Sequence, residues 1–242
     1  MRNEMNEYIK SIFNGLPDIP TETYFQEGFF RDPARTINTD DRYFLSPADG
    51  FVIYSGIINP DEAITEVKGK KYSIQDIIRD KHYNKRSLVI GIFMTCYDVH
   101  INRVPYDGIL SYAEHEPLET NNLPMIDVES NIFYQENIKL IYEDYLHLNQ
   151  RVVNKVYSPS INREYYMVQV GDYDVDTITP FHIGQNTPVY QGNRFSMIRY
   201  GSQVDLVIPV ADDDELTSLV SEKEHVTGGI TKLVKINDKS LL

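Results

Sequence analysis

The sequence predicts a mainly β protein of the α+β class, with an antiparallel β-sandwich or barrel-like core and a few short helices. Runs of β-branched and aromatic residues recur along the chain, and Gly, Pro, Asn and Asp separate them. Hydrophobic residues make up 41% of the 242 residues and aromatic residues 12%, which is typical of a globular protein. A chain of this length is sufficient for one substantial hydrophobic core.

The first expected element is an amphipathic helix within residues 1–17. Gly15 and Pro17 mark its end, and its polar face carries Glu as well as Lys. Because helices that lie on membranes tend to have a basic polar face, we expect this helix to pack on the body of the protein or on a partner subunit. Its apolar side chains recur at helical spacing, and they are Met5, Tyr8, Ile9, Ile12, Phe13 and Leu16.

Residues 18–242 are expected to form a single domain, since no internal repeat, low-complexity tract or long linker interrupts them. A short helix is expected over Ser73–Lys81, where Ile74, Ile77 and Ile78 recur at helical spacing. The expected strands are Phe51–Ile58, Ser87–Phe93, Arg151–Val156, Tyr165–Val170, Asp205–Pro209 and Gly229–Ile236.

Charge and cysteine content argue against several classes of function. The formal net charge of −13 at pH 7 argues against a nucleic-acid partner and against membrane binding through overall charge. The single cysteine, Cys96, cannot form an internal disulfide, and no secretory signal or run of ~18 apolar residues is apparent. We therefore expect a cytoplasmic protein, with peripheral contact at the inner membrane face left open. No histidine has ligand spacing, so no metal site is expected.

Three segments supply an acid, a base and a hydroxyl, the parts of a self-activating acyl-transfer site. The acid is Asp49 in Ser-Pro-Ala-Asp-Gly, the base is His100 in Asp-Val-His-Ile-Asn-Arg-Val-Pro, and the hydroxyl is that of Ser202. The reference pKa of histidine, near ~6.5, suits a base at neutral pH. Asp49 is expected to hold the His100 imidazole through a hydrogen bond, as the acid of a catalytic triad does. Gly201 can adopt backbone conformations closed to other residues, which suits a strained, accessible carbonyl. Taken singly, these residues also fit a turn aspartate, a structural histidine and a strand-edge serine.

Five short segments follow one another in a specific order: Phe29–Arg35, Ser46–Gly50, Val67–Ile74, Asp98–Gly108 and Gly192–Pro209. This order resembles the phosphatidylserine decarboxylase family, whose members cut their own chain at a Gly-Ser bond and make a pyruvoyl cofactor there. The resemblance implies cleavage between Gly201 and Ser202 into chains 1–201 and 202–242, which stay associated. It also implies that the pyruvoyl group forms from Ser202.

The resemblance implies a lyase that converts phosphatidylserine to phosphatidylethanolamine and carbon dioxide. A pyruvoyl ketone condenses with a substrate amine, and the linked carbonyl accepts the electrons that remain when carbon dioxide leaves. By family analogy, His100 also donates the proton to the α-carbon. Arg103 follows in the same segment, where some relatives have a second histidine and others an arginine. Its planar guanidinium is expected to hold a phosphate or carboxylate of the substrate.

The segment Val170–Asp176 departs from the family pattern, because it carries Asp172, Asp174 and Asp176 where relatives have apolar and small residues before a basic pair. Aspartates lining a pocket would disfavour an anionic phosphate. The same machinery acting on a soluble amino acid or its derivative therefore stays open as an alternative. A third reading, a non-catalytic β binding module, is disfavoured by the intact acid, base and Gly-Ser set. The sequence leaves the formation of a homo-oligomer open.

Overall fold

The structure is a computed structural model that describes residues 30–134, 140, 143–173, 176–181, 184–199, 202–211 and 215–237. The expected N-terminal helix within residues 1–17 lies outside these ranges, as do Gly201 at the expected cleavage bond and Asp174. Strands dominate the described ranges and helices are few and short, which confirms the predicted class.

The first half of the described chain contains β1 (Tyr43–Leu45), β2 (Gly50–Ile58), β3 (Thr65–Val67), β4 (Lys70–Tyr72), α3 (Ile74–Ile78), β5 (Ser87–Met94), β6 (Ile101–Arg103), β7 (Gly108–His115) and α4 (Ile126–Tyr134). The second half contains α5 (Tyr145–Leu148), β8 (Arg151–Ser158), β9 (Arg163–Val170), β10 (Ile178–Pro180), β11 (Thr187–Val189), β12 (Arg194–Ile198), β13 (Ser202–Pro209), β14 (Leu216–Ser218), β15 (His225–Val226) and β16 (Lys232–Ile236). Every expected strand and the expected short helix is present, with bounds that differ by a few residues.

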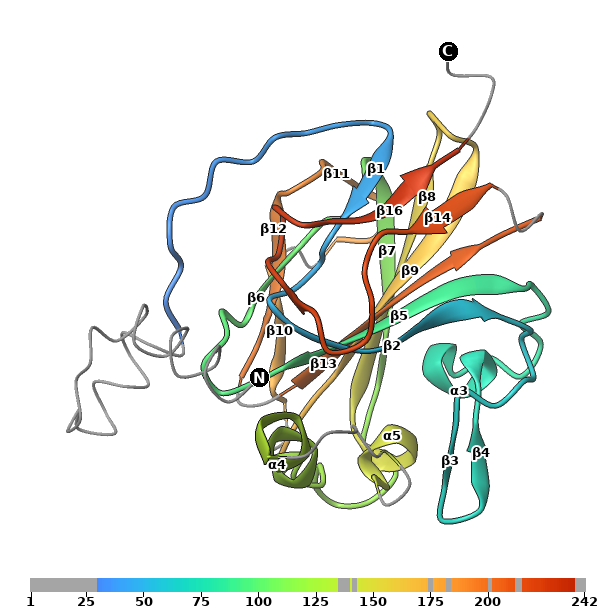
Figure 1. Ribbon diagram of the computed structural model, residues 1–242, viewed down its shortest axis with the longest axis vertical. Coiled ribbons are helices and arrows are strands. Elements are labelled where there is room, and N and C mark those ends of the chain that lie inside the picture. Colours follow the sequence, from blue (N-terminus) through green and yellow to red (C-terminus); the bar gives the residue numbers. More distant parts are fainter. Residues whose placement is uncertain are drawn as a thin grey trace.

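An eight-stranded antiparallel sheet of order β11-β7-β8-β9-β13-β5-β2-β15 forms the centre of the molecule (Figure 1). Two three-stranded sheets, β1-β16-β14 and β10-β12-β6, accompany it, and β3 and β4 form a separate hairpin. Residues of β1, β12 and β16 pack against one face of the large sheet, while residues of α3, α4 and α5 pack against the other. The result is a layered fold with the large sheet inside it.

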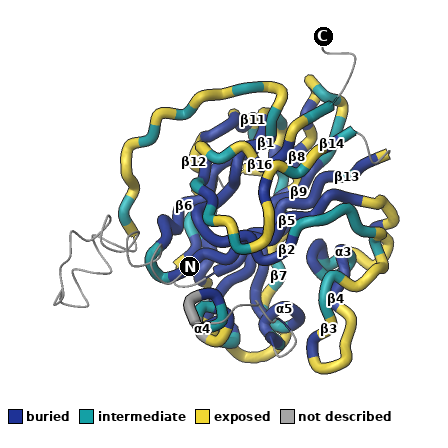
Figure 2. Tube along the Cα trace, in the orientation of Figure 1, coloured by how far each residue is buried: buried dark blue, intermediate teal, exposed yellow. Residues whose placement is uncertain are grey.

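Both faces of the large sheet are buried, as the dark blue strands of Figure 2 show. Successive side chains of a strand point to opposite faces. Along β5, Ile90 and Ile92 therefore join the hydrophobic cluster under the small sheets, which we call the first core. Val89 and Phe93 join the cluster under the helices, the second core. A strand in this position contributes to both cores at once.

Strand β13 is interior, paired with β5 on one side and β9 on the other. Its first residue, Ser202, lies opposite Met94 of β5. By strand alternation, Ser202 faces the first core together with Val204. Gln203 and Asp205 face the second core. The two faces of this strand therefore carry different polar groups.

A buried polar cluster ties β13 to the second core. Tyr54 Oη donates to Asp205 Oδ1 (2.6 Å), Gln203 Nε2 donates to the same oxygen (2.7 Å), and Tyr145 Oη donates to Gln203 Oε1 (2.7 Å). Burial raises the pKa of Asp205 to about 6, and the hydrogen bonds from Tyr54 and Gln203 limit the rise. The Asp205 carboxyl group thus joins β13 to β2, and the Gln203 amide joins β13 to α5.

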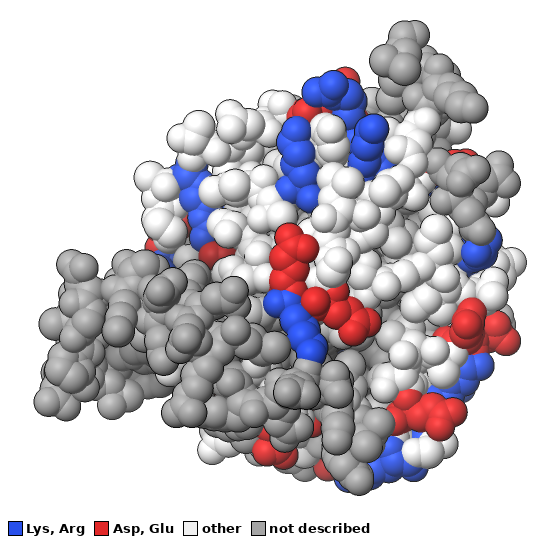
Figure 3. All heavy atoms as spheres, in the orientation of Figure 1, with Lys and Arg blue, Asp and Glu red and all other residues white. Residues whose placement is uncertain are grey.

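Charged side chains of both signs are interspersed on the face of the molecule in Figure 3. An anionic partner approaching the visible part of this face would meet local groups, not a broad basic surface. Within the described ranges, no helix is both long and apolar enough to cross a bilayer.

Replacement of Asp205 should change how stability depends on pH. Its folded pKa of about 6 lies above the ordinary value of 3.8, so the folded state holds the proton more tightly than the unfolded state. Its stabilising contribution is complete below about pH 4 and is lost as the pH rises through about 6. The free energy of unfolding of the wild type should therefore fall, relative to Asp205→Asn, by roughly 2–3 kcal/mol over this range.

Urea unfolding between about pH 4 and pH 7 measures this difference, with the exposed Asp61→Asn as the matched control. Parallel pH curves for the wild type and Asp205→Asn would contradict the assignment.

Candidate active site

The segment from Phe30 to Asp41 runs along the outside of the molecule before β1 (Figure 1) and supplies charged groups to the motif segments. Arg31 Nη2 donates to the backbone carbonyl of Tyr97 (2.6 Å), just before Asp98. The same segment contributes Asp32 and Arg35. We call residues 30–41 the strap, because its side chains bind several elements that are distant in sequence.

Arg35 of the strap forms a buried, two-pronged ion pair with Asp49. Arg35 Nη1 lies 2.7 Å from Asp49 Oδ1 and Nη2 lies 2.6 Å from Oδ2, with side chains 6% and 5% exposed. The backbone N–H of Gly228 also donates to Asp49 Oδ1 (2.7 Å), and Arg35 Nη1 donates to the Gly228 carbonyl (2.7 Å). Two parallel hydrogen bonds fix the plane of the carboxylate as well as its charge. The pair therefore locks the strap, the Asp49 turn and the turn before β16 together.

The turn that carries Asp49 requires its final glycine. Gly50 has φ +149°, and a Cβ there would lie 2.2 Å from the Phe93 carbonyl oxygen. Ser46 Oγ donates to the Ala48 carbonyl (2.6 Å) and closes the turn from the other side. The Ser-Pro-Ala-Asp-Gly segment is thus a tight turn that packs against β5, with a buried aspartate.

His100 is completely buried, and its Nδ1 lies 3.0 Å from the backbone carbonyl oxygen of Asp98. A carbonyl oxygen only accepts hydrogen bonds, so Nδ1 carries the proton and Nε2 is the basic nitrogen. The carbonyl of His100 accepts from the backbone N–H of Ile198 (3.0 Å), at the end of β12. The histidine motif therefore lies beside the chain that leads into Ser202.

The carboxylate of Asp98 is paired with His225, which is 127 residues away in sequence. His225 Nε2 lies 2.7 Å from Asp98 Oδ1, and Thr95 donates to Oδ2 from its backbone N–H (2.8 Å) and its hydroxyl (2.7 Å). Burial favours the neutral form of both partners, but the hydrogen bond and opposite charge outweigh it. The pKa of Asp98 is consequently lowered and that of His225 raised.

Ser202 is also completely buried, and its Oγ donates to the thioether sulfur of Met94 at 3.3 Å. Sulfur is a weak acceptor, so the hydroxyl proton is not held by a strong partner in this contact. A nucleophilic oxygen in such a position can turn toward another acceptor at low cost.

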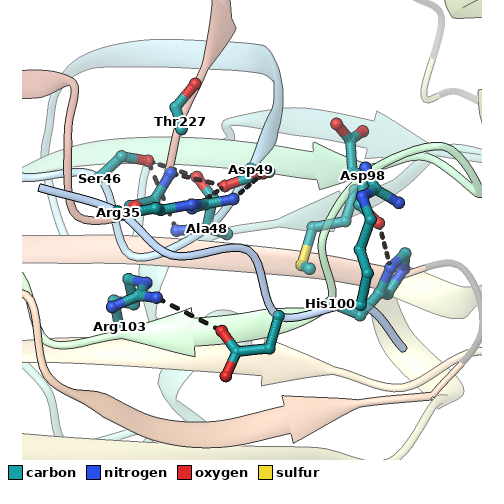
Figure 4. Close-up of polar contacts among 12 residues, drawn as sticks. Arg35, Ser46, Ala48, Asp49, Asp98, His100, Arg103 and Thr227 are labelled. Carbon is teal, nitrogen blue, oxygen red and sulfur yellow. Dashed lines mark hydrogen bonds and ion pairs between the residues drawn. The ribbon is translucent and has the colours of Figure 1, made fainter. Parts of the chain in front are cut away.

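The structure brings the three motif segments to one region but not into one chain of hydrogen bonds. Asp49 directs its carboxylate to Arg35 and Gly228, whereas His100 is held by Asp98, and Figure 4 shows these as separate groups. The expected hydrogen bond between Asp49 and His100 is therefore not formed among the described contacts of Asp49. The catalytic roles of both residues stay predictions.

Arg103 lies in a cluster of opposite charges at the strap. Its Nη1 donates to the Gly192 carbonyl (2.8 Å), and Nη2 lies 3.6 Å from Asp32 Oδ1, which also pairs with Arg194. Burial lowers the pKa of Arg103, and the charges of Arg35 and Arg194 lower it further. The three arginines outnumber Asp32 and Asp49 by one, so this cluster favours an added anion.

The two described aspartates of the Val170–Asp176 segment, Asp172 and Asp176, differ in their surroundings. Asp172 is buried, and its Oδ1 accepts from the backbone N–H of Met125 (2.9 Å), immediately before α4. Burial raises the pKa of Asp172 to about 7. Asp176 is exposed, with φ +51°. Asp172 thus serves the start of a helix in this structure.

The sequence analysis assigned no role to Arg35 or His225. Arg35 lies in the first motif segment, and this position could have indicated that it belongs to the site. His225 offered none, because its partner Asp98 is distant in sequence and local spacing cannot reveal the contact. In the part of the chain that the structure describes, no three His, Cys, Asp or Glu side chains come together as metal ligands.

Comparison with known proteins identifies the family. A family model described as phosphatidylserine decarboxylase matches residues 24–233. A phosphatidylserine decarboxylase proenzyme of Amoebophilus asiaticus is 26% identical over 212 residues, which cover 86% of this chain and 74% of that protein. A similarly named proenzyme of Pelagibacter ubique is 28% identical over 228 residues, covering 94% and 87%.

A third relative, named putative archaetidylserine decarboxylase proenzyme, comes from Methanothermobacter thermautotrophicus and is 30% identical over 213 residues, covering 88% of this chain and 81% of that protein. The match of the family model extends over most of the chain and includes all five motif segments and the residues of the site. The chain therefore belongs to the phosphatidylserine decarboxylase family of carboxy-lyases.

Proposed function

We propose that this chain cuts itself between Gly201 and Ser202, that residue 202 becomes a pyruvoyl group, and that the processed protein removes carbon dioxide from phosphatidylserine to leave phosphatidylethanolamine. Membership of the family supports the reaction and the substrate. The observation that carries the proposal is the position of Ser202, a buried hydroxyl on the first residue of an interior strand. It contacts Met94, whose sulfur also contacts Asn102 of the His100 motif segment.

Processing begins when Ser202 Oγ attacks the carbonyl carbon of residue 201. The C–N bond breaks, the nitrogen of residue 202 takes a proton, and an ester replaces the amide. Loss of the Cα proton then releases Oγ with the carboxylate of residue 201. Addition of water and loss of ammonia leave the ketone. His100, with its basic nitrogen defined by the Asp98 carbonyl, is our proposed base.

For Asp49 we propose a role through the Arg35 pair. The predicted role was to orient His100, but the carboxylate binds Arg35 and the N–H of Gly228. A direct contact with His100 would require Asp49 to leave a buried, two-pronged ion pair, which is costly. The Asp98 carbonyl is better placed to set the tautomer of His100.

The two chains should stay together after cleavage, because β13 remains paired with β5 and β9. A pyruvoyl ketone at residue 202 would condense with the serine amine of the lipid and accept electrons as carbon dioxide leaves. The arginine cluster around Arg103 is our proposed contact for the phosphate. Because the substrate lies in a bilayer, we propose a cytoplasmic protein that binds the inner membrane peripherally.

Self-cleavage is tested by the mass of the purified protein. We expect two associated chains, with the smaller one spanning residues 202–242 and blocked to Edman degradation by its ketone. Ser202→Ala should remain a single chain, because no oxygen is left to attack. His100→Ala should slow the appearance of the small chain by roughly 10²–10⁴-fold, since a general base is lost. An intact wild-type chain with a free Ser202 hydroxyl would refute self-cleavage.

The role of Asp49 is tested by replacing it alone and together with Arg35. Asp49→Leu should slow processing and lower the free energy of unfolding by roughly 3–5 kcal/mol, because Arg35 is left buried without its carboxylate. The double variant Arg35→Met/Asp49→Leu should regain stability and processing rate, since neither charge remains. The ion pair of Arg42 with Asp40 offers a control, because the Arg42 side chain is 66% exposed. Arg42→Met should change neither the free energy of unfolding nor the processing rate by a comparable amount. If the double variant regains stability but not processing, Asp49 acts directly on His100.

The substrate is tested with the processed protein in detergent. Phosphatidylserine should be decarboxylated, and free serine and other soluble amino acids should not. Archaetidylserine is tested as a third substrate, because one relative is named putative archaetidylserine decarboxylase proenzyme. Arg103→Lys should raise KM more than it lowers kcat, since lysine cannot hold the Gly192 carbonyl and an anion with one planar fork.

Arg42→Lys is the control for the loss of an exposed guanidinium. Turnover of a soluble amino acid with none of the lipid would move the assignment to the alternative substrate class.

A further inference from the structure

A chain of buried amide side chains leads through the first core to Ser202. Asn154 of β8 bonds Gln169 of β9 (3.0 Å), and Gln169 bonds Asn102 of β6 (2.6 Å). Asn102 Nδ2 then lies 3.5 Å from Met94 Sδ, the same sulfur that accepts the Ser202 hydroxyl at 3.3 Å. All of these residues are at most 2% exposed. This row of amides therefore connects the large sheet with β6 and ends on the Met94 sulfur, which Ser202 Oγ also contacts.

The orientation of every amide in this chain follows from its first member. Asn154 Nδ2 lies 3.0 Å from the Met167 carbonyl and 3.3 Å from the Val152 carbonyl, and carbonyl oxygens only accept. Its NH₂ group must therefore face them and Gln169 Oε1 as well. This places Gln169 Nε2 toward Asn102 Oδ1, and it leaves the NH₂ group of Asn102 toward Met94 Sδ, the atom that Ser202 Oγ also contacts. The contacts of Asn154 on β8 thus determine, through Gln169 on β9, which way the Asn102 amide is oriented.

This arrangement is unusual for a purely structural network. Amides in an apolar core cost free energy unless strong acceptors satisfy them. Asn154 and Gln169 have such acceptors, but Asn102 Nδ2 ends on a thioether at 3.5 Å, a weak and long contact. A donor held rigidly with a poor acceptor is suited to a stronger acceptor that appears during a reaction.

We propose that Asn102 is a catalytic residue of self-processing, and that Gln169 and Asn154 are its positioning residues. The inference rests on the proposed self-cleavage at Ser202. The stronger acceptor is the Ser202 side-chain oxygen during elimination from the ester. In that step a base removes the Cα proton, a double bond forms between Cα and Cβ of residue 202, and the Cβ–Oγ bond breaks. The electron pair goes to Oγ, and Asn102 Nδ2 donates a hydrogen bond to the negative charge that develops there.

A role of Asn102 in elimination can be separated from a general structural effect, because the ester intermediate reacts differently from a peptide bond. Hydroxylamine cleaves an ester under native conditions but leaves a peptide bond intact. If elimination is slow, the ester accumulates, and hydroxylamine cleaves it. The rate of chain cleavage then rises again. The small chain then begins with Ser202 and carries a free amine. If formation of the ester is slow, hydroxylamine has no effect on the rate.

The experiment follows newly translated chain in a cell-free system, with and without hydroxylamine, by gel and mass spectrometry. Asn102→Leu should form the ketone-bearing small chain roughly 100-fold more slowly, the effect of losing one donor to a developing oxyanion. Hydroxylamine should restore chain cleavage in this variant. Gln169→Met should show a smaller loss with the same rescue. Asn102→Leu/Gln169→Met should be no slower than Asn102→Leu alone, since the residues act as one unit.

Two controls keep the outcomes distinct. Asn149→Leu removes an equally buried amide that bonds Leu123 and Gly171, so it should destabilise the fold without a hydroxylamine-dependent rescue. Ser202→Ala should not be cleaved under any condition. A wild-type chain that never cleaves would refute the proposed function. Suppose that the wild-type chain processes normally. The role of Asn102 would then be refuted if Asn102→Leu and Gln169→Met both process at the wild-type rate. It would also be refuted if both variants are slow and hydroxylamine does not restore their cleavage.

Discussion

The rest of the structure depends on the interior position of β13. Its backbone is paired with β5 from Ser202 to Pro209 and with β9 from Gln203 to Val207. Because strands on both sides and cores on both faces hold this strand, the bond before Ser202 can break while the strand stays in place. A chain that begins at residue 202 would then present its first group at a fixed position in the interior, which is what a cofactor made from the chain requires.

The two faces of β13 make different polar contacts. On the second-core face, Asp205 and its hydrogen-bond partners fix the strand to β2 and α5. On the first-core face, Ser202 Oγ contacts the Met94 sulfur. The same sulfur is contacted by Asn102, the last of the linked amides. The strap adds a third constraint, because Arg35 ties the Asp49 turn to the strap and to the Gly228 carbonyl. Rigid elements therefore position each group of the site, so little reorganisation is needed when charge develops.

The fold class and five strands of the large sheet could be predicted from the sequence, because β-branched runs between turn residues indicate strands directly. The strand β7, the strand β12 and the short strands were not expected. The last expected strand began too early, since Gly229 has φ +73° and belongs to a turn before β16. The site was harder to predict. The motif segments indicated which parts of the chain meet, but not which side chains bond one another. Asp49 pairs with Arg35, and Asp98 with His225, and both contacts depend on three-dimensional proximity that spacing does not encode.

In our proposal, residue 202 carries the group that reacts with the amine of the substrate. Covalent trapping is the direct test. The purified, processed protein is incubated with phosphatidylserine and sodium cyanoborohydride, and the chain of residues 202–242 is digested and analysed by mass spectrometry. We expect a reduced covalent adduct of the lipid amine on residue 202, and none on Ser202→Ala. Decarboxylation of the lipid with no adduct at residue 202, or an adduct on a lysine side chain alone, would contradict it.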